Sequence, residues 1–127
     1  MQGNNLFEYA VVRVVPRPER EEFLNVGVIL YCSGKDFLDM KYTVDSKKLM
    51  ALCEDIDCSG IAQHLQAFEE ICKGGSSNSP IARLDAPSRF RWLTATRSTV
   101  VQTSRVHPGL CEDPAETLQR LHKQLVL

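Results

Sequence analysis

The sequence predicts an α+β domain in which an antiparallel sheet of about four strands carries two or three helices, packed mainly on one face to give two layers. Three patterns support this fold class: β-branched and aromatic runs near the start, strict alternation over residues 38–44, and helical spacing in the centre and at the end. The chain has 127 residues, 43% hydrophobic and 24% charged, which suits one globular domain over residues 1–127.

The first two strands are expected at residues 7–15 and 24–31. The first is rich in aromatic and β-branched residues, is apolar on both faces, and ends at Pro16, which has no amide for a ladder. Gly27 lies inside the second strand, where glycine marks a bulge or a close backbone approach. A tight turn at Ser33 and Gly34 leads to a half-buried third strand, antiparallel to the second.

Helical spacing begins after Asp45 and Ser46, which are both suitable N-caps, and continues to Ile56. A second helix is expected from about Ser59, with an apolar stripe and a C-terminal stop at Gly74. The segment 74–79 (GGSSNS) is expected to be a flexible surface loop within the domain.

The last third predicts an irregular segment at 80–88, a short strand at 89–94 and a fourth strand at 98–106. In the extended reading of RFRWL, Phe90 and Trp92 share one side of the segment, so Trp92 is expected to be a core or subcore anchor. The closing helix has the clearest signal, with Asp113 as N-cap, Pro114 at the first helical position and Glu116 completing a capping box.

The net charge of -1 provides no general attraction to nucleic acid or anionic lipid. A nucleic-acid surface built from Arg89, Phe90, Arg91 and Trp92 is therefore a weaker hypothesis than the others. The longest apolar run, 26–32, is far shorter than the ~20 residues of a membrane helix, and the first residues lack the pattern of a signal peptide. The five scattered cysteines suggest reduced thiols, so we expect a cytoplasmic protein.

Sequence motifs of common catalytic sites and cofactor sites are missing, so we expect no cofactor and lean against an enzyme. No metal site is expected either, because Cys53, Cys58, His64 and Cys72 include no closely spaced ligand pair. His107 and Cys111 are the one nucleophile and base close in sequence, in a presumed loop 107–113 before the last helix. No third group that would orient them is visible, so a structural role for this turn is preferred to catalysis.

Polar residues on otherwise apolar strands are the main candidates for a binding site. Arg13 stands among four valines, Asn25 precedes Val26, and Gln102 follows two valines. A charge in such a strand must be paired or face a cleft, so Arg13 either pairs with an acid such as Glu22 or Asp39, or belongs to a site.

The segments YAVVRVVPRPEREEFLNVGVILY, RFRWLTATRSTVVQTSRVHPGL and DPAETLQRL carry a resemblance over almost the whole chain. With them the sequence resembles an uncharacterised bacterial family, the domain of unknown function 3037. The resemblance implies no reaction. It does imply a protein partner, a kinase-like product of a neighbouring gene that resembles HipA toxins.

Two functions follow as expectations. The first is a non-catalytic binding or accessory module that acts with such a kinase-like partner. The alternative is an enzyme or ligand-binding protein that holds a phosphate or carboxylate with Arg and Gln side chains and uses His107 as acid or base. The candidate binding residues for either function are Arg13, Asn25, Arg97, Gln102 and His107.

Overall fold

The computed structural model describes residues 5–75 and 79–127. Its elements are β1 (Asn5–Val14), β2 (Leu24–Cys32), β3 (Phe37–Tyr42), α1 (Ser46–Leu52), α2 (Cys58–Lys73), α3 (Ala86–Leu93), β4 (Val101–Thr103), β5 (His107–Cys111) and α4 (Pro114–Leu125), with short 3₁₀ turns at Pro18–Arg20, Ser33–Lys35 and Ile81–Arg83. The expected α+β class with an antiparallel sheet is confirmed, and the described residues form four α-helices where two or three were expected.

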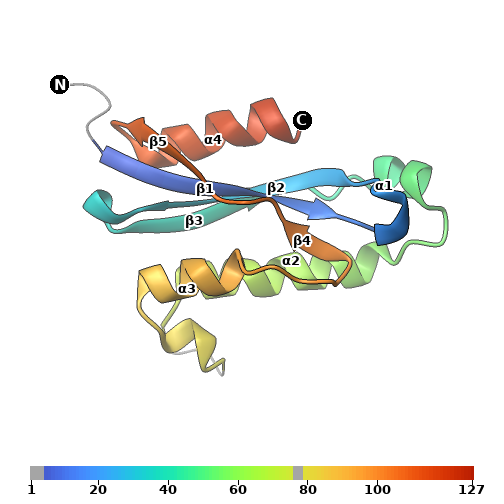
Figure 1. The fold of residues 1–127 in the computed structure, drawn as a ribbon, viewed down its shortest axis with the longest axis horizontal. Coiled ribbons are helices and arrows are strands. Elements are labelled where there is room, and N and C mark those ends of the chain that lie inside the picture. Colours follow the sequence, from blue (N-terminus) through green and yellow to red (C-terminus); the bar gives the residue numbers. More distant parts are fainter. Residues whose placement is uncertain (1–4, 76–78) are drawn as a thin grey trace.

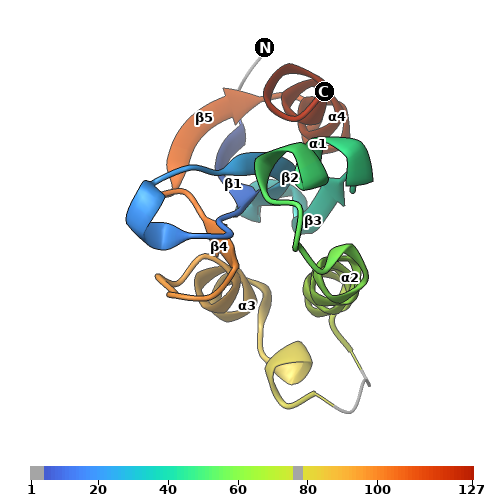
Figure 2. The ribbon, with the colours of Figure 1, turned by 90° about the vertical axis from the view of Figure 1, so that its right-hand side faces the viewer.

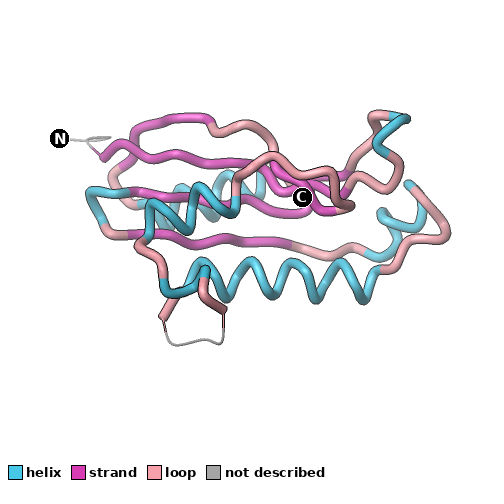
Figure 3. Tube along the Cα trace, turned by 60° about the horizontal axis from the view of Figure 1, so that its bottom comes forward, coloured by secondary structure: helices cyan, strands magenta, loops and turns pink. Residues whose placement is uncertain are grey.

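The sheet has the order β3-β2-β1-β4, and β5 also pairs with β1 (Figures 1 and 3). Both β4 and β5 lie on the same edge of β1: β4 pairs with residues 12–14 and β5 with residues 5–9. Ser104 joins the two partners, because its amide donates to the Val11 carbonyl and its hydroxyl accepts from the Val11 amide, both at 2.8 Å. Of the strand expected at 98–106, only residues 101–103 form a strand, β4.

Helices cover both faces of the sheet (Figures 1 and 2). Val12, Val14 and Ile29 pack with α2 and α3 in one apolar core, whereas Phe7, Val28 and Leu30 pack with α4 in another. This arrangement follows from the apolar character of β1 and β2 on both faces, since each face must be covered. α1 lies at the end of the sheet where β1 ends and β2 begins, and its Leu49 is fully buried.

The expected bulge at Gly27 is confirmed, as is the close backbone approach. The register between β1 and β2 shifts between Val12 and Arg13, so that Gly27 opposes Val12 and Asn25 opposes Arg13. A Cβ added at Gly27 would lie 2.9 Å from the Tyr42 Cβ and 3.0 Å from the Lys41 carbonyl oxygen. Only glycine allows β2 and β3 to approach this closely.

The caps expected at Asp45, Gly74 and Asp113 are confirmed. The Asp45 carboxylate accepts from the amides of Lys47 and Lys48, and the Asp113 carboxylate accepts from Ala115 at 3.0 Å. α2 begins at Cys58, one residue earlier than expected, with Asp57 as its cap. Part of the loop expected at 74–79, namely residues 76–78, lies outside the described residues.

Two expectations in the last third are wrong. Residues 89–94 are not a strand but part of α3, which Asp85 caps by accepting from the Ser88 amide at 3.0 Å. In a helix Phe90 and Trp92 point in different directions: Phe90 is buried, and Trp92 packs partly buried against the same core, as a subcore anchor. Residues 107–111 are a strand rather than a turn, and Gly109 fits there because the Phe7 ring lies 2.5 Å from the place of a Cβ.

Candidate functional site

Three of the five predicted binding residues lie in one row across the sheet. Arg13 of β1 is directly opposite Asn25 of β2 and Gln102 of β4. Its neighbours Val12 and Val14 point into the core under α2 and α3, so the row faces the α4 side. The Asn25 side-chain amide donates to the Leu125 carbonyl at the end of α4, at 3.2 Å. The register of the sheet therefore gathers Arg13, Asn25 and Gln102.

Arg13 has neither of the acidic partners expected for it. Glu22 is held by Arg20, with bonds of 2.7 and 3.2 Å, and the Asp39 carboxylate accepts from the Met40 amide. Among the described residues the only ion pair is that between Arg20 and Glu22, so no carboxylate balances Arg13. The expectation of an internal ion pair at Arg13 is wrong.

The Arg13 side chain is instead partly desolvated and stacked on an aromatic ring. Its guanidinium carbon lies 4.1 Å from the centroid of Phe23, which is 46% exposed. The Nε atom is buried and makes no hydrogen bond in the structure, and the same is true of the Asn25 Oδ1 atom. Burial lowers the pKa of Arg13. A desolvated cation without a counter-charge is costly, so this position favours an acceptor supplied from outside.

His107 lies on the same sheet but apart from the row. It opposes Tyr9, and the two rings are 5.2 Å apart at an interplanar angle of 32°. Tyr9 precedes Arg13 by four residues, which is about 13 Å along a strand. His107 and Cys111 are at opposite ends of β5, and burial raises the pKa of the Cys111 thiol. These two residues are thus not arranged as a base and an activated nucleophile.

Arg97 lies on the other side of the sheet from Arg13, where it closes the end of α3. It donates to the carbonyl oxygens of Leu93, at 2.9 Å, and of Trp92. Its guanidinium carbon also lies 4.5 Å from the Trp92 ring and 5.2 Å from the Phe68 ring. Cations at a helix C-terminus satisfy the last carbonyls and the helix dipole. The structure therefore separates Arg97 from the other candidates and gives it a structural task.

Arg89 has a similar task at the end of α2. Its Nη1 donates to the carbonyls of Ile71 and Cys72, at 2.8 and 2.6 Å, and its Nε donates to Leu84 at 3.0 Å. Phe90 is buried, so Arg89 and Phe90 of the suggested nucleic-acid surface are engaged within the fold. Arg89 and Arg97 thus serve helix ends, whereas Arg91 remains exposed.

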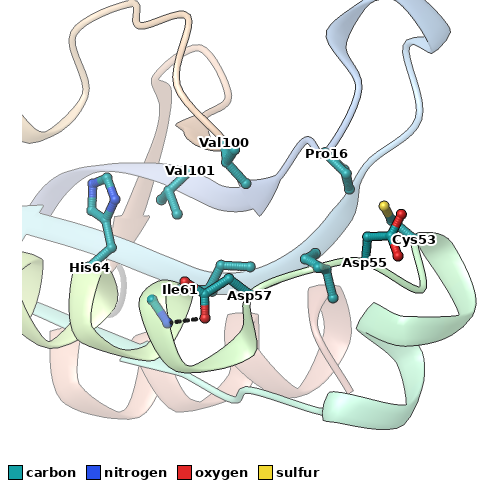
Figure 4. A pocket seen from close by; sticks show the side chains of 10 residues that line it. Pro16, Cys53, Asp55, Asp57, Ile61, His64, Val100 and Val101 are labelled. Carbon is teal, nitrogen blue, oxygen red and sulfur yellow. Dashed lines mark hydrogen bonds between the residues drawn. The ribbon is translucent and has the colours of Figure 1, made fainter.

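A pocket of about 310 Å³ opens where β1 ends, and the sequence did not point to it (Figure 4). It is lined by residues from three separate segments, at 16, 53–64 and 100–101: Pro16, Cys53, Asp55, Ile56, Asp57, Gly60, Ile61, His64, Val100 and Val101. None of the five predicted binding residues lines it. Because the walls come from distant parts of the chain, no local pattern could reveal the pocket before the fold was known.

The polar groups of this pocket differ in character. Asp57 caps α2, accepting from the Gly60 amide at 3.0 Å, while burial and then the charge of Arg97 lower the pKa of His64. Cys53 and His64 lie at opposite ends of the pocket in Figure 4, so they are not a catalytic pair. Within residues 5–75 and 79–127, no three His, Cys, Asp or Glu side chains are arranged to hold a metal ion.

The described part of the chain contains no helix with the length and apolarity required to cross a membrane. Neither the curated proteins nor the solved structures include a match to this sequence. A family model does match residues 9–126, which is nearly the whole chain, and the match includes the five predicted binding residues and the lining of the pocket. The chain therefore belongs to the family described as protein of unknown function DUF3037.

Proposed function

We propose that this protein is a non-catalytic binding module, and that a protein partner contacts it at Arg13, Phe23, Asn25 and Gln102, which we call the Arg13 surface. The observation that carries the proposal is the Arg13 guanidinium, which is partly desolvated and forms no ion pair with a carboxylate among the described residues. A carboxylate on the partner supplies the missing charge. Charge-assisted bonds of this kind are about twice as strong as neutral ones.

The residue types of the Arg13 surface also suit a protein interface. Arginine and large aromatic residues are the side chains that most often dominate binding energy. Phe23 is 46% exposed, and the ring holds the guanidinium from one side at 4.1 Å, so the arginine is already oriented for a partner. A pre-oriented side chain loses less entropy on binding.

The family resemblance suggests the partner, a HipA-like kinase encoded by a neighbouring gene. We propose that the two proteins meet in the cytoplasm, where the five unpaired cysteines would stay reduced. The separation of His107 from Cys111 along β5 supports a non-catalytic role.

The alternative is a small anionic ligand, phosphate or carboxylate, held by Arg13 and Gln102. This alternative uses the same unpaired Arg13, but two other residues expected at the anion site, Arg97 and His107, are not beside it. Arg97 is engaged at the end of α3. His107 pairs with Tyr9, which lies four residues along β1 from Arg13. A single arginine is a weak anion site for a small ligand, because bidentate or multiple donors are usual. We therefore favour the protein partner.

The test is binding of the full chain to the purified HipA-like kinase, measured by calorimetry. Arg13→Ala should weaken binding tenfold or more, on the ~2 kcal/mol scale of a lost charged hydrogen bond. Arg13→Lys should restore little of it, because an ammonium lacks the planar fork. Arg105→Ala, an exposed arginine just after β4, is the matched control and should bind like the parent.

Two other results are decisive. If the folded proteins form no complex, the kinase assignment is wrong. If Arg13→Ala binds the kinase normally, the Arg13 surface is not the contact. Titrations with inorganic phosphate and acetate, followed by NMR at Gln102 and Asn25, test the small-ligand alternative, and a response to phosphate that Arg13→Ala abolishes would favour it.

A further inference from the structure

The pocket of Figure 4 has the build of a small-molecule site. Its floor is apolar: Ile61 and Val101 are almost fully buried, at 5% and 1% exposure. Val100 forms part of the rim and is 44% exposed. The volume of about 310 Å³ lies at the lower end of the range for ligand sites. This pocket thus offers apolar contact to a compact ligand and remains open to solvent.

The charges around the pocket favour a positive ligand. Asp55 and Asp57 contribute carboxylates, and none of the ten lining residues is lysine or arginine. An anion would gain little from the start of α2, because the Asp57 carboxylate already occupies the Gly60 amide. The Asp57 charge also offsets the positive end of the α2 dipole.

We propose that this pocket binds a small organic cation, an amine with a compact apolar body. The ammonium group lies on the side of the pocket that carries the Asp55 and Asp57 carboxylates, and the apolar body packs on Ile61 and Val101. This site lies on the α2 and α3 side of the sheet, away from the Arg13 surface, so it does not depend on the proposed function.

The orientation follows from the other end of the pocket. His64 lies there in Figure 4, with its ring edge against Phe68 at 5.0 Å between centroids. Arg97 is close enough for its charge to lower the pKa of His64, in addition to the larger effect of burial. The charge of Arg97 therefore disfavours a cation beside His64, whereas the two carboxylates favour it beside Asp55 and Asp57.

Two arginines near the pocket do not cancel the negative charge of Asp55 and Asp57. Arg17 and Arg20 line a separate hollow that shares only Pro16 and Cys53 with the pocket. Arg20 is held there by Glu22 at 2.7 Å. Arg17 remains exposed to solvent, where water and salt screen its charge.

The first test compares three probes of similar shape: phenethylamine, 2-phenylethanol and phenylacetate. NMR titration of the full chain should show shifts at Ile61, His64 and Val101 with the amine. The alcohol should bind at least fivefold more weakly and the acid more weakly still. Equal binding of amine and alcohol would overturn charge recognition, and no shifts with any probe up to its solubility limit would overturn the site.

The second test uses carboxylate variants that keep the fold. Asp57→Asn keeps an efficient N-cap for α2 while removing the charge, and Asp55→Asn removes the other charge. Each should weaken amine binding roughly three- to tenfold. Asp45→Asn makes the same change at the cap of α1, outside the pocket, and should bind like the parent. Arg13→Ala should also leave amine binding unchanged, which separates this proposal from the proposed function. Amine binding that survives both pocket variants would refute the assignment.

Discussion

The guanidinium of Arg97 lies 4.5 Å over the Trp92 ring while its Nη1 donates to the carbonyl of the next residue, Leu93, at 2.9 Å. One side chain thus both covers the indole and closes α3. A residue from the polar loop that follows the helix does the work usually given to a C-terminal glycine motif.

Arg97→Ala should therefore destabilise the protein by about 2 kcal/mol, the sum of lost bonds to partly buried carbonyls and lost stacking. The measurement is urea unfolding followed by fluorescence of Trp92, the one tryptophan in the chain. Arg91→Ala, an exposed arginine of α3, is the control and should change stability by less than ~0.5 kcal/mol. Equal effects in the two variants would show that the contacts of Arg97 contribute little.

Gly27→Ala should cost about 2 kcal/mol or more, because the added Cβ would meet the Lys41 carbonyl oxygen and the Tyr42 Cβ at 3.0 and 2.9 Å. Both are atoms of β3 that cannot move without the strand. At Gly34 the nearest atom is the Asn5 side-chain oxygen at 3.3 Å, so Gly34→Ala should be nearly neutral. Thermal unfolding of the two variants gives the comparison, and similar melting temperatures would contradict the close approach of β2 and β3.

The fold was predictable where a local signal agreed with the tertiary contacts. Asp45, Asp113 and Gly74 are caps that depend on their own helices, and Gly27 needs only its neighbouring strand. The placement of α4 on the second face was not expected, since the helices were expected mainly on one face, although the apolar character of β1 on both sides is visible in the sequence.

The last third was harder because its local patterns are ambiguous. RFRWL alternates polar and apolar residues like a strand, yet Asp85 at its N-cap and Arg97 at its C-terminus make it helical. The pair Asp85 and Pro87 repeats the kind of start seen at Asp113 and Pro114, so this signal was available. Residues 107–111 carry Pro and Gly and resemble a turn, but the open edge of β1 recruits them as a strand.

The site divides in the same way. Arg13 and Asn25 are unusual residues on apolar strands, and their hairpin register brings them together. Glu22 could have balanced the charge of Arg13, but its carboxylate is bound by Arg20, two residues before it in the chain. Such competition between side chains is not encoded in any spacing.

Protonation of His122 should destabilise the protein. This residue of α4 is only 5% exposed, its Nε2 lies 2.9 Å from the Thr43 hydroxyl, and burial and then the charge of Lys41 lower its pKa from the ordinary 6.5. The unfolded chain therefore binds this proton at a higher pH than the folded protein. The part of the stability that depends on neutral His122 is fully present above about pH 6.5 and is lost as the pH falls below it.

The measurement is the urea midpoint between about pH 8 and pH 5, for the parent and for His122→Gln, which keeps a partner for Thr43. The variant should show a smaller loss at low pH. Some loss should remain, because the pKa of His64 is lowered too. Identical pH profiles would mean that His122 does not titrate with unfolding.

Arg13→Met should leave the free energy of unfolding unchanged or raise it by up to about 1 kcal/mol, although the residue is in the middle of the sheet. Methionine keeps an unbranched chain against Phe23 and favours contact with an aromatic ring, while it removes a desolvated charge whose Nε makes no hydrogen bond. The same substitution at Arg97 should cost about 2 kcal/mol, since there the guanidinium binds carbonyls inside the fold. Urea unfolding of the two methionine variants side by side measures the difference.

A loss above about 1 kcal/mol in Arg13→Met would show that the fold itself uses the Arg13 charge, and the main support for the Arg13 surface as a contact would be gone. A stable Arg13→Met that no longer binds the HipA-like kinase would show instead that this arginine is kept for its partner at no benefit to the fold.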